Sequence, residues 1–309
     1  MTFANLATRR EPMTELRKTL TQIFVWLEQN YPHYASQLQP GLSRKKIESL
    51  VKPLPFKLSK EIHELYQWKN GTPNPISTAY LAPGYRFLPL KEAIRAYYDS
   101  QDCYDPSFFS QFWFPIFEEG INNIFTVGSK QQEDRSIILD FSGEDGLAEI
   151  HHSSLEKMIL VTKNCFEVGA YYFKPEKYNE EYLDILYVDR TKLTQVVRKY
   201  DPVIIENVLE KLEQALNSCS YAKFCEVAFG ARRFREPKIT EMLIKMSLLS
   251  PSDTEDLDSL KGIRLFAISL LGDIGGRRAF ATLSLLKEDT DSDIQQAAQY
   301  ALSRLEISY

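Results

Sequence analysis

Apolar residues recur at helical spacing along the first part of the chain. Between residues 14 and 30 they fall on one face every three or four positions, which predicts an amphipathic helix. The stretch 54–71 carries the same pattern, with Ser59 as a candidate N-cap. Gly71 marks the end of that helix, because glycine readily adopts the left-handed conformation that closes a helix. The chain therefore begins with short helices that bury one face.

A different texture follows in the middle of the chain. Four short apolar or alternating segments occur at residues 113–117, 121–127, 136–141 and 148–151, with turn residues between them. Because no helix separates these segments, they predict an antiparallel meander. Helices precede the meander and another starts near Leu155, so the first domain is predicted to be α+β. For the crowded aromatic stretch up to residue 190 we expect a loop around Pro175 and a short helical tail.

From Lys192 onward the pattern is helical, with no strand signal, and it contains an internal repeat. A shift of 31 residues aligns four apolar pairs, which are Ile263 with Ile294, Ala267 with Ala298, Leu271 with Leu302, and Ile274 with Leu305. Small residues at the centre of each helix allow the close approach that stacked helical hairpins require. We therefore expect two domains, an α+β domain at residues 1–190 and an all-α repeat domain at residues 191–309.

Composition narrows the class of protein. The net charge of −5 disfavours nucleic acid as the main partner, which usually needs a basic surface. The four cysteines match no zinc motif, so we expect no metal and no cofactor. Residues 1–12 lack the apolar core of a signal peptide, and no run of eighteen apolar residues occurs. These features predict a cytoplasmic protein without a membrane span.

Candidate catalytic groups are few. His151 and His152 end a predicted strand, but a metal site would need further ligands that the sequence does not offer nearby. Glu118 and Glu119 form an acidic pair in a predicted turn, where carboxylates are usually solvated. No nucleotide-binding or hydrolase motif occurs. We therefore expect no catalytic site.

Two arginine pairs are candidate binding residues. Arg232 and Arg233 follow Gly230, and Arg277 and Arg278 follow a pair of glycines. Both pairs fall at the turn of a predicted helical hairpin, so stacking would bring them to one basic edge suited to an acidic protein patch or a phosphate. The alternative is that they are solvated cations near helix C-termini, where the helix dipole favours them.

A second candidate surface is the acidic and aromatic segment at residues 99–112, which we expect to be a partner-facing loop. Tyrosine and tryptophan are favoured at interfaces, and acidic residues flank the aromatic ones here. The candidate partner-binding residues in this segment are Asp99, Asp102, Tyr104, Asp105 and Phe109.

Several short motifs resemble the SUKH superfamily, which covers bacterial immunity proteins and fungal cell-wall regulators. They are a Leu-Pro start at residue 54, a Leu-Tyr-x-Trp core ending at Trp68, the Asn-Gly stop, the segment 87–94 and the Trp-Phe-Pro-Ile strand at residue 113. The resemblance covers roughly residues 20–185. The acidic residue that many members carry after the glycine is missing at residues 120–123, which puts any role attached to it in doubt.

The last part resembles HEAT-like repeats of the phycobilisome-lyase type. The line Ile-Arg-x-x-Ala-x-x-x-Leu-Gly-x-Ile-Gly is spelled out at residues 263–275. The two resemblances together imply a non-enzymatic protein-binding module, such as an immunity protein that neutralises a toxin domain. An intracellular scaffold or regulator is one alternative. A bilin lyase or phycobilisome-related chaperone, acting through the repeats, is the other.

Overall fold

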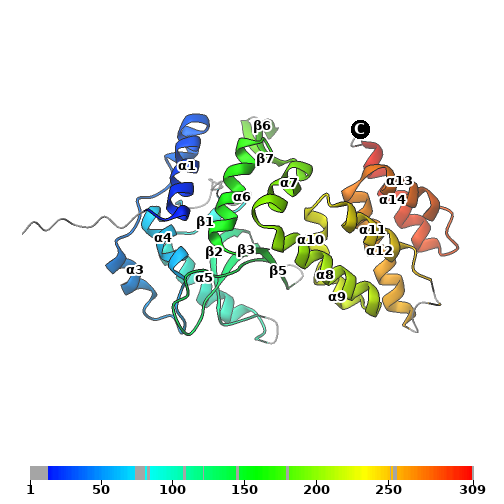
Figure 1. Cartoon of the computed structure of the whole chain (residues 1–309), viewed down its shortest axis with the longest axis horizontal. Coiled ribbons are helices and arrows are strands. Elements are labelled where there is room, and N and C mark those ends of the chain that lie inside the picture. Colours follow the sequence, from blue (N-terminus) through cyan, green and yellow to red (C-terminus); the bar gives the residue numbers. More distant parts are fainter. Residues whose placement is uncertain are drawn as a thin grey trace, which may run out of the picture.

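The computed structural model describes most of the chain. The described residues are 13–73, 81, 84–106, 109–120, 122–143, 146–178, 181–250, 252 and 256–307. The segment expected as a leader, residues 1–12, lies outside them. Figure 1 shows an elongated molecule in which the sheet lies near the middle and the last helices form one end.

The first part of the fold is helical, as the apolar spacing predicts. Its helices are α1 (Glu15–Asn30), α2 (Pro32–Ala35), α3 (Arg44–Val51), α4 (Lys60–Trp68) and α5 (Leu90–Cys103). Helix α4 begins directly after Ser59, as expected, although the Ser59 hydroxyl accepts from Ser136 rather than capping the helix. Gly71 has a positive φ of 72°, and a Cβ there would lie 2.4 Å from the backbone nitrogen of Pro89. Only glycine fits this passage between α4 and the segment that leads into α5.

A five-stranded antiparallel sheet follows. The strands are β1 (Arg86–Phe87), β2 (Trp113–Glu119), β3 (Asn122–Val127), β4 (Ile138–Ser142) and β5 (Leu147–His152), and they pair in sequence order. This order confirms the predicted meander and the α+β class. Helix α6 (Leu155–Glu167) comes directly after the sheet.

The two faces of the sheet bury different partners, because side chains alternate along each strand. One face places Ile124 and Ile138 in the main apolar core, together with α1, α4 and α6. The opposite face carries Phe125 and Phe141 in a separate aromatic cluster, which the segment after α5 closes through Phe109. Apolar side chains therefore cover both faces of the sheet. They hold it rigid next to the polar groups at its edge.

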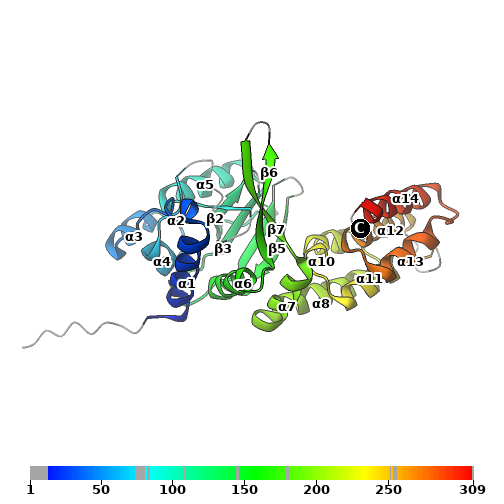
Figure 2. The same ribbon diagram turned by 90° about the horizontal axis from the view of Figure 1, so that it is seen from above.

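The aromatic stretch after α6 corrects one prediction. In place of a loop and a helical tail, it forms a two-stranded hairpin of β6 (Tyr171–Tyr178) and β7 (Glu181–Val188). Aromatic residues favour strands, and Tyr172 stacks on Tyr187 across the pair at 5.8 Å. Proline is tolerated because, among the strands that the structure describes, β6 and β7 pair only with each other. Figure 2 shows this hairpin standing apart from the five-stranded sheet.

From Arg190 onward the described chain is helical. Its helices are α7 (Arg190–Tyr200), α8 (Pro202–Ser218), α9 (Tyr221–Cys225), α10 (Ala228–Arg233), α11 (Pro237–Ser247), α12 (Leu257–Ile274), α13 (Gly276–Leu286) and α14 (Ser292–Ile307). Seven of the eight residues aligned by the 31-residue shift are buried, and the eighth, Ile274, is partly buried. Helices α12 and α14 pack closely, since a Cβ on Gly272 would lie 2.9 Å from that of Ala301.

The apolar core continues without a break from the sheet into these helices. Buried residues from Leu16 in α1 to Leu305 in α14 belong to one connected cluster. None of the helices in the described ranges has the length and apolar character needed to cross a bilayer. The junction of sheet and helices is also where polar groups of both halves meet.

Candidate functional site

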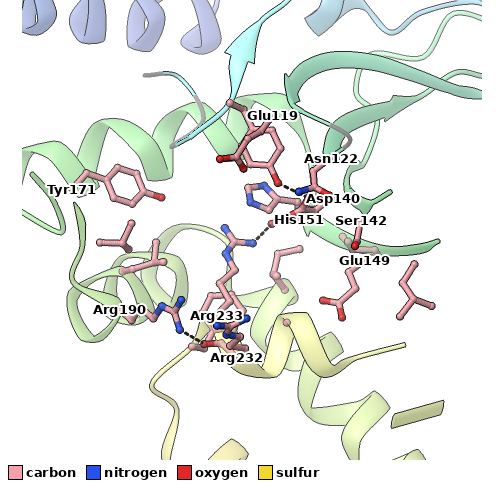
Figure 3. Close-up of a pocket in the computed structure, with 18 residues that line it drawn as sticks. Glu119, Asn122, Asp140, Ser142, Glu149, His151, Tyr171, Arg190, Arg232 and Arg233 are labelled. Carbon is pink, nitrogen blue, oxygen red and sulfur yellow. Dashed lines mark hydrogen bonds between the residues drawn. The ribbon is translucent and has the colours of Figure 1, made fainter. Parts of the chain in front are cut away.

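A cavity of about 540 Å³ lies at this junction. Its lining comes from the ends of strands β2 to β5 on one side and from α7, α8 and α10 on the other. Figure 3 shows Glu119 and Asp140 on one wall, Arg190 and Arg232 on the opposite wall, and the guanidinium group of Arg233 extending between them to His151. Its volume is within the range typical of small-ligand sites.

The acidic wall is built from one face of the sheet. Asp140 in β4 lies directly opposite Glu149 in β5, and Glu119 ends β2 two strands away. The hydroxyl of Tyr85 donates to Asp140 at 2.9 Å. Burial raises the pKa of Asp140, and burial together with the nearby Asp140 raises the pKa of Glu119. The wall therefore concentrates negative charge in a partly desolvated place.

A β-bulge shapes the end of β5. Leu139 pairs with Ile150 and Ile138 pairs with His152, so His151 is an extra residue in the strand. In a regular strand, consecutive side chains point to opposite faces. Here the side chains of both histidines lie toward the helical half of the molecule. His151 lines the cavity, and His152 contacts the helical half.

His152 belongs to a buried network that joins the two halves. Its Nδ1 lies 2.9 Å from a carboxylate oxygen of Asp201, the residue between α7 and α8, and its Nε2 lies 3.0 Å from Arg233. Asp201 also accepts from the backbone and the hydroxyl of Ser153. Burial alone would raise the pKa of Asp201, but the hydrogen bonds from His152 and Ser153 outweigh it and lower that pKa.

The protonation of His152 follows from these partners. Burial lowers its pKa to about 4, against the opposing effect of Asp201, so the ring is neutral near pH 7. A neutral ring with an arginine donor at Nε2 carries its proton on Nδ1 and donates to Asp201. Arg233 also donates to the carbonyl of His151 at 2.8 Å, so one guanidinium fixes both histidines.

The basic wall gathers around a single carboxylate. Arg232 and Arg304 pair with Asp273, near the end of α12, at 2.9 and 2.8 Å. Arg235 donates to the carbonyl of Asp273 at 2.7 Å, and Arg190 donates to that of Arg232 at 3.0 Å. Burial and the neighbouring Arg190 lower the pKa of Arg235 to about 10. The arginines thus repel one another across a short distance.

Gly230 in α10 lies close to side chains of both halves. A Cβ there would lie 2.7 Å from a methyl group of Val208 and 2.8 Å from a carboxylate oxygen of Glu149. A side chain at this position would therefore displace the carboxylate of Glu149 and crowd Val208 in α8.

Chemically, the cavity offers hydrogen-bond donors and acceptors of both charges. Arginine presents up to five N–H donors, and an ionised carboxylate accepts on both oxygens. In the described ranges, no group of three or more His, Cys, Asp and Glu side chains is placed to hold a metal ion. The arrangement suits an organic ligand with charged groups.

Of the predicted site residues, the first arginine pair lies in this cavity. Arg232 is exposed and Arg233 is half-buried, and they have different partners. Arg277 and Arg278 are exposed in the first turn of α13 and do not line the cavity. They are therefore at a helix N-terminus, where the dipole does not favour cations, although the pair follows the end of α12.

The acidic and aromatic segment corrects a second prediction. Asp99 and Asp102 lie within α5, which continues to Cys103, so this part is not a loop. Both are exposed, as is Asp105. Phe109, however, is only 3% exposed and stacks on the partly buried Tyr104 at 5.0 Å. The two rings cover the second face of the sheet, so of the five candidate residues the three aspartates are the exposed ones.

Several cavity residues were not predicted as site residues. Glu119 was expected to be a solvated turn residue; it is exposed, but it ends a strand and lines the cavity. Arg190, Asp140 and Glu149 belong to no motif in the sequence. An acidic residue flanked by apolar ones within a strand, as at Asp140, could have indicated a site residue, because a buried carboxylate needs a partner or a ligand.

Comparison with known proteins adds no assignment to this site. No protein-family model matches the chain, and the search of curated proteins gives no significant match.

Proposed function

We propose that this protein is a non-enzymatic binding protein that docks a protein partner at the cavity between the sheet and the C-terminal helices. The observation that supports the proposal is the pair of oppositely charged walls on either side of the cavity. The cavity has a volume of about 540 Å³. Charged groups that line a concave site give specificity and steer association.

The side chains of His152 and Ser153, which are of the kind that act as general base or nucleophile, already form structural hydrogen bonds. Both ring nitrogens of His152 are engaged, one by Asp201 and the other by Arg233. The hydroxyl of Ser153 donates to the same aspartate at 2.5 Å. A general base or nucleophile must reach its substrate, and these groups instead hold the junction together. Their engagement supports a binding role.

Charge favours a basic partner. The chain carries a net charge of −5, and Asp99, Asp102 and Asp105 add an exposed acidic surface on and after α5. Complementary charge accelerates encounter and disfavours acidic proteins. In the role that the SUKH resemblance implies, the partner is a basic toxin domain in the cytoplasm, and α7, α8 and α10 supply the second wall of its binding site.

The test is reconstitution with an identified partner. The chain is used to capture proteins from cells in parallel with a matched variant, Glu119→Gln, and proteins lost with the variant are purified and mixed with it. We expect a one-to-one complex by light scattering, with affinity that falls as salt rises. Several weak partners and no stoichiometric complex would contradict the immunity role and favour a scaffold. Turnover of a substrate by the purified chain would overturn the proposal.

A further inference from the structure

The two charged walls of the cavity are not paired with each other. Among the described residues, neither Glu119 nor Asp140 forms an ion pair, although three arginines line the same cavity. Arg232 is paired outside the acidic wall, with Asp273, and Arg233 is engaged by His151 and His152. The carboxylates of Glu119 and Asp140 therefore remain open to a cationic ligand, although the hydroxyl of Tyr85 already donates to Asp140.

Each wall gathers like charges. On the acidic side, Asp140 and Glu149 are direct cross-strand neighbours, an arrangement that is unfavourable for like charges. On the basic side, Arg232 and Arg304 share the carboxylate of Asp273, Arg235 donates to the carbonyl of that residue, and Arg190 donates to the carbonyl of Arg232. A cation at the first wall and an anion at the second would each reduce the repulsion.

A third group in the cavity lacks a partner. The Nδ1 atom of His151 is buried and has no hydrogen-bond partner among the described residues. Burial, Arg233 and His152 lower the pKa of this ring well below its ordinary value, so the ring is neutral. Figure 3 shows His151 between Glu119 and Arg233. An unsatisfied buried nitrogen is costly, and a hydrogen bond to a ligand would remove that cost.

We propose that the cavity binds the C-terminal residue of a partner chain when that residue is basic. Its ammonium or guanidinium group would lie against Glu119 and Asp140, and its terminal carboxylate against Arg190 and Arg232. Arginine binds carboxylates through paired N–H donors, which suits a terminal carboxylate. This inference rests on the proposed function, because it names the part of the protein partner that enters the cavity.

Four small probes separate the two charges. N-acetyl-arginine carries both, N-acetyl-arginine amide only the cation, N-acetyl-citrulline only the anion, and N-acetyl-citrulline amide neither. Calorimetry with the full-length chain should give the highest affinity for N-acetyl-arginine, with a loss of about tenfold or more when either charge is removed. N-acetyl-lysine with a free side chain tests an ammonium, and free arginine tests an amino acid as ligand.

Two substitutions test which wall binds the cation and which binds the carboxylate. Glu119→Gln should weaken N-acetyl-arginine about tenfold and leave N-acetyl-citrulline unchanged, because it removes only the partner of the cation. Arg190→Gln should weaken both probes, because both carry the carboxylate, and leave the amide of arginine unchanged. Glu288→Gln, an exposed acid after α13 that does not line the cavity, is the matched control and should change nothing. Thermal unfolding of each variant shows that it is folded.

The outcomes distinguish this inference from the proposed function. Equal affinity for all four probes, or none for any, would overturn the inference. A partner that binds equally well after deletion of its last residue would also overturn it, while leaving protein binding in place. If N-acetyl-arginine binds as expected but no protein complex forms, the proposed function fails and the cavity is a site for a free basic amino acid or small peptide.

Discussion

The junction between the sheet and the helices depends on the guanidinium group of Arg233. Replacement of Arg233 by methionine keeps much of the side-chain volume but removes the donors to the carbonyl of His151 and to Nε2 of His152. His152 is only 2% exposed, so water does not readily replace the lost donor. A buried acceptor left unpaired costs about 1–3 kcal/mol.

The two acceptors left without a donor set the expected loss in the free energy of unfolding. Their summed cost is about 2–6 kcal/mol. Removing a half-buried cation beside two histidines offsets part of this, because desolvation of the guanidinium no longer opposes folding. We therefore expect Arg233→Met to lower the free energy of unfolding by about 2–4 kcal/mol. A protein of ordinary stability has only about 5–15 kcal/mol in total.

The neighbouring arginine provides a matched control. Arg232 is about half exposed, at 49%, and its partner Asp273 keeps a second ion pair with Arg304. Arg232→Met should therefore cost only about 0–1 kcal/mol, as exposed ion pairs do. Urea unfolding followed by circular dichroism measures both variants, and an unchanged slope shows that the comparison is valid. Equal losses for the two variants would refute the argument that the His151–His152 contacts stabilise the junction.

Four further substitutions test other features of the structure. Gly120→Ala should cost about 1 kcal/mol for its positive φ alone, since none of the described residues lies within 4 Å of the added Cβ, whereas Gly71→Ala should cost about 2 kcal/mol more because its Cβ meets the backbone of Pro89. Glu61 is buried and its pKa is raised to about 7. Its contribution to the free energy of unfolding is therefore complete below pH 4.5 and is lost as the pH rises to about 7. Glu61→Gln should remove that loss. The pKa of His152 is lowered to about 4, so stability is lost as the pH falls from 6.5 to about 4, and His152→Asn should flatten that decline.

Each of these has a measurement that decides it. Chemical unfolding compares the two glycine variants, and equal losses would show that the close backbone approach at Gly71 is absent. Melting temperatures from pH 4 to 8 compare the Glu61 and His152 variants with the unaltered chain. A melting-temperature difference from the unaltered chain that stays constant over this range would contradict the assigned pKa shifts.

The sheet could be predicted because its signal is local. Each strand from β2 to β5 alternates or is bounded by turn residues within a few positions, and consecutive strands pair. The β6–β7 hairpin was missed although its signal is also local. Pro175 suggested a loop, but a hairpin with two free edges accepts a proline, and the density of aromatic residues was the better guide.

The site could be predicted only in part. Arg232 and Arg233 are adjacent in sequence and were found as a pair, but their partners Asp273 and His152 lie 41 and 81 residues away. Hydrophobic spacing identifies which face of an element is buried, and it carries no information on which polar groups meet across a junction. Burial of Phe109 was missed for the same reason, since the aromatic cluster that receives it forms only when the sheet is assembled.

The extra residue in β5 makes the junction sensitive to the length of the chain there. A single-residue deletion at His151 would leave His152 opposite Ile138 and restore regular pairing, and it would remove the local bend that the extra residue gives to the end of β5. Ser153, which holds Asp201 from the sheet side, would then lose its place. Sequences that diverge from this one should therefore accept substitutions at His151 more readily than insertions or deletions.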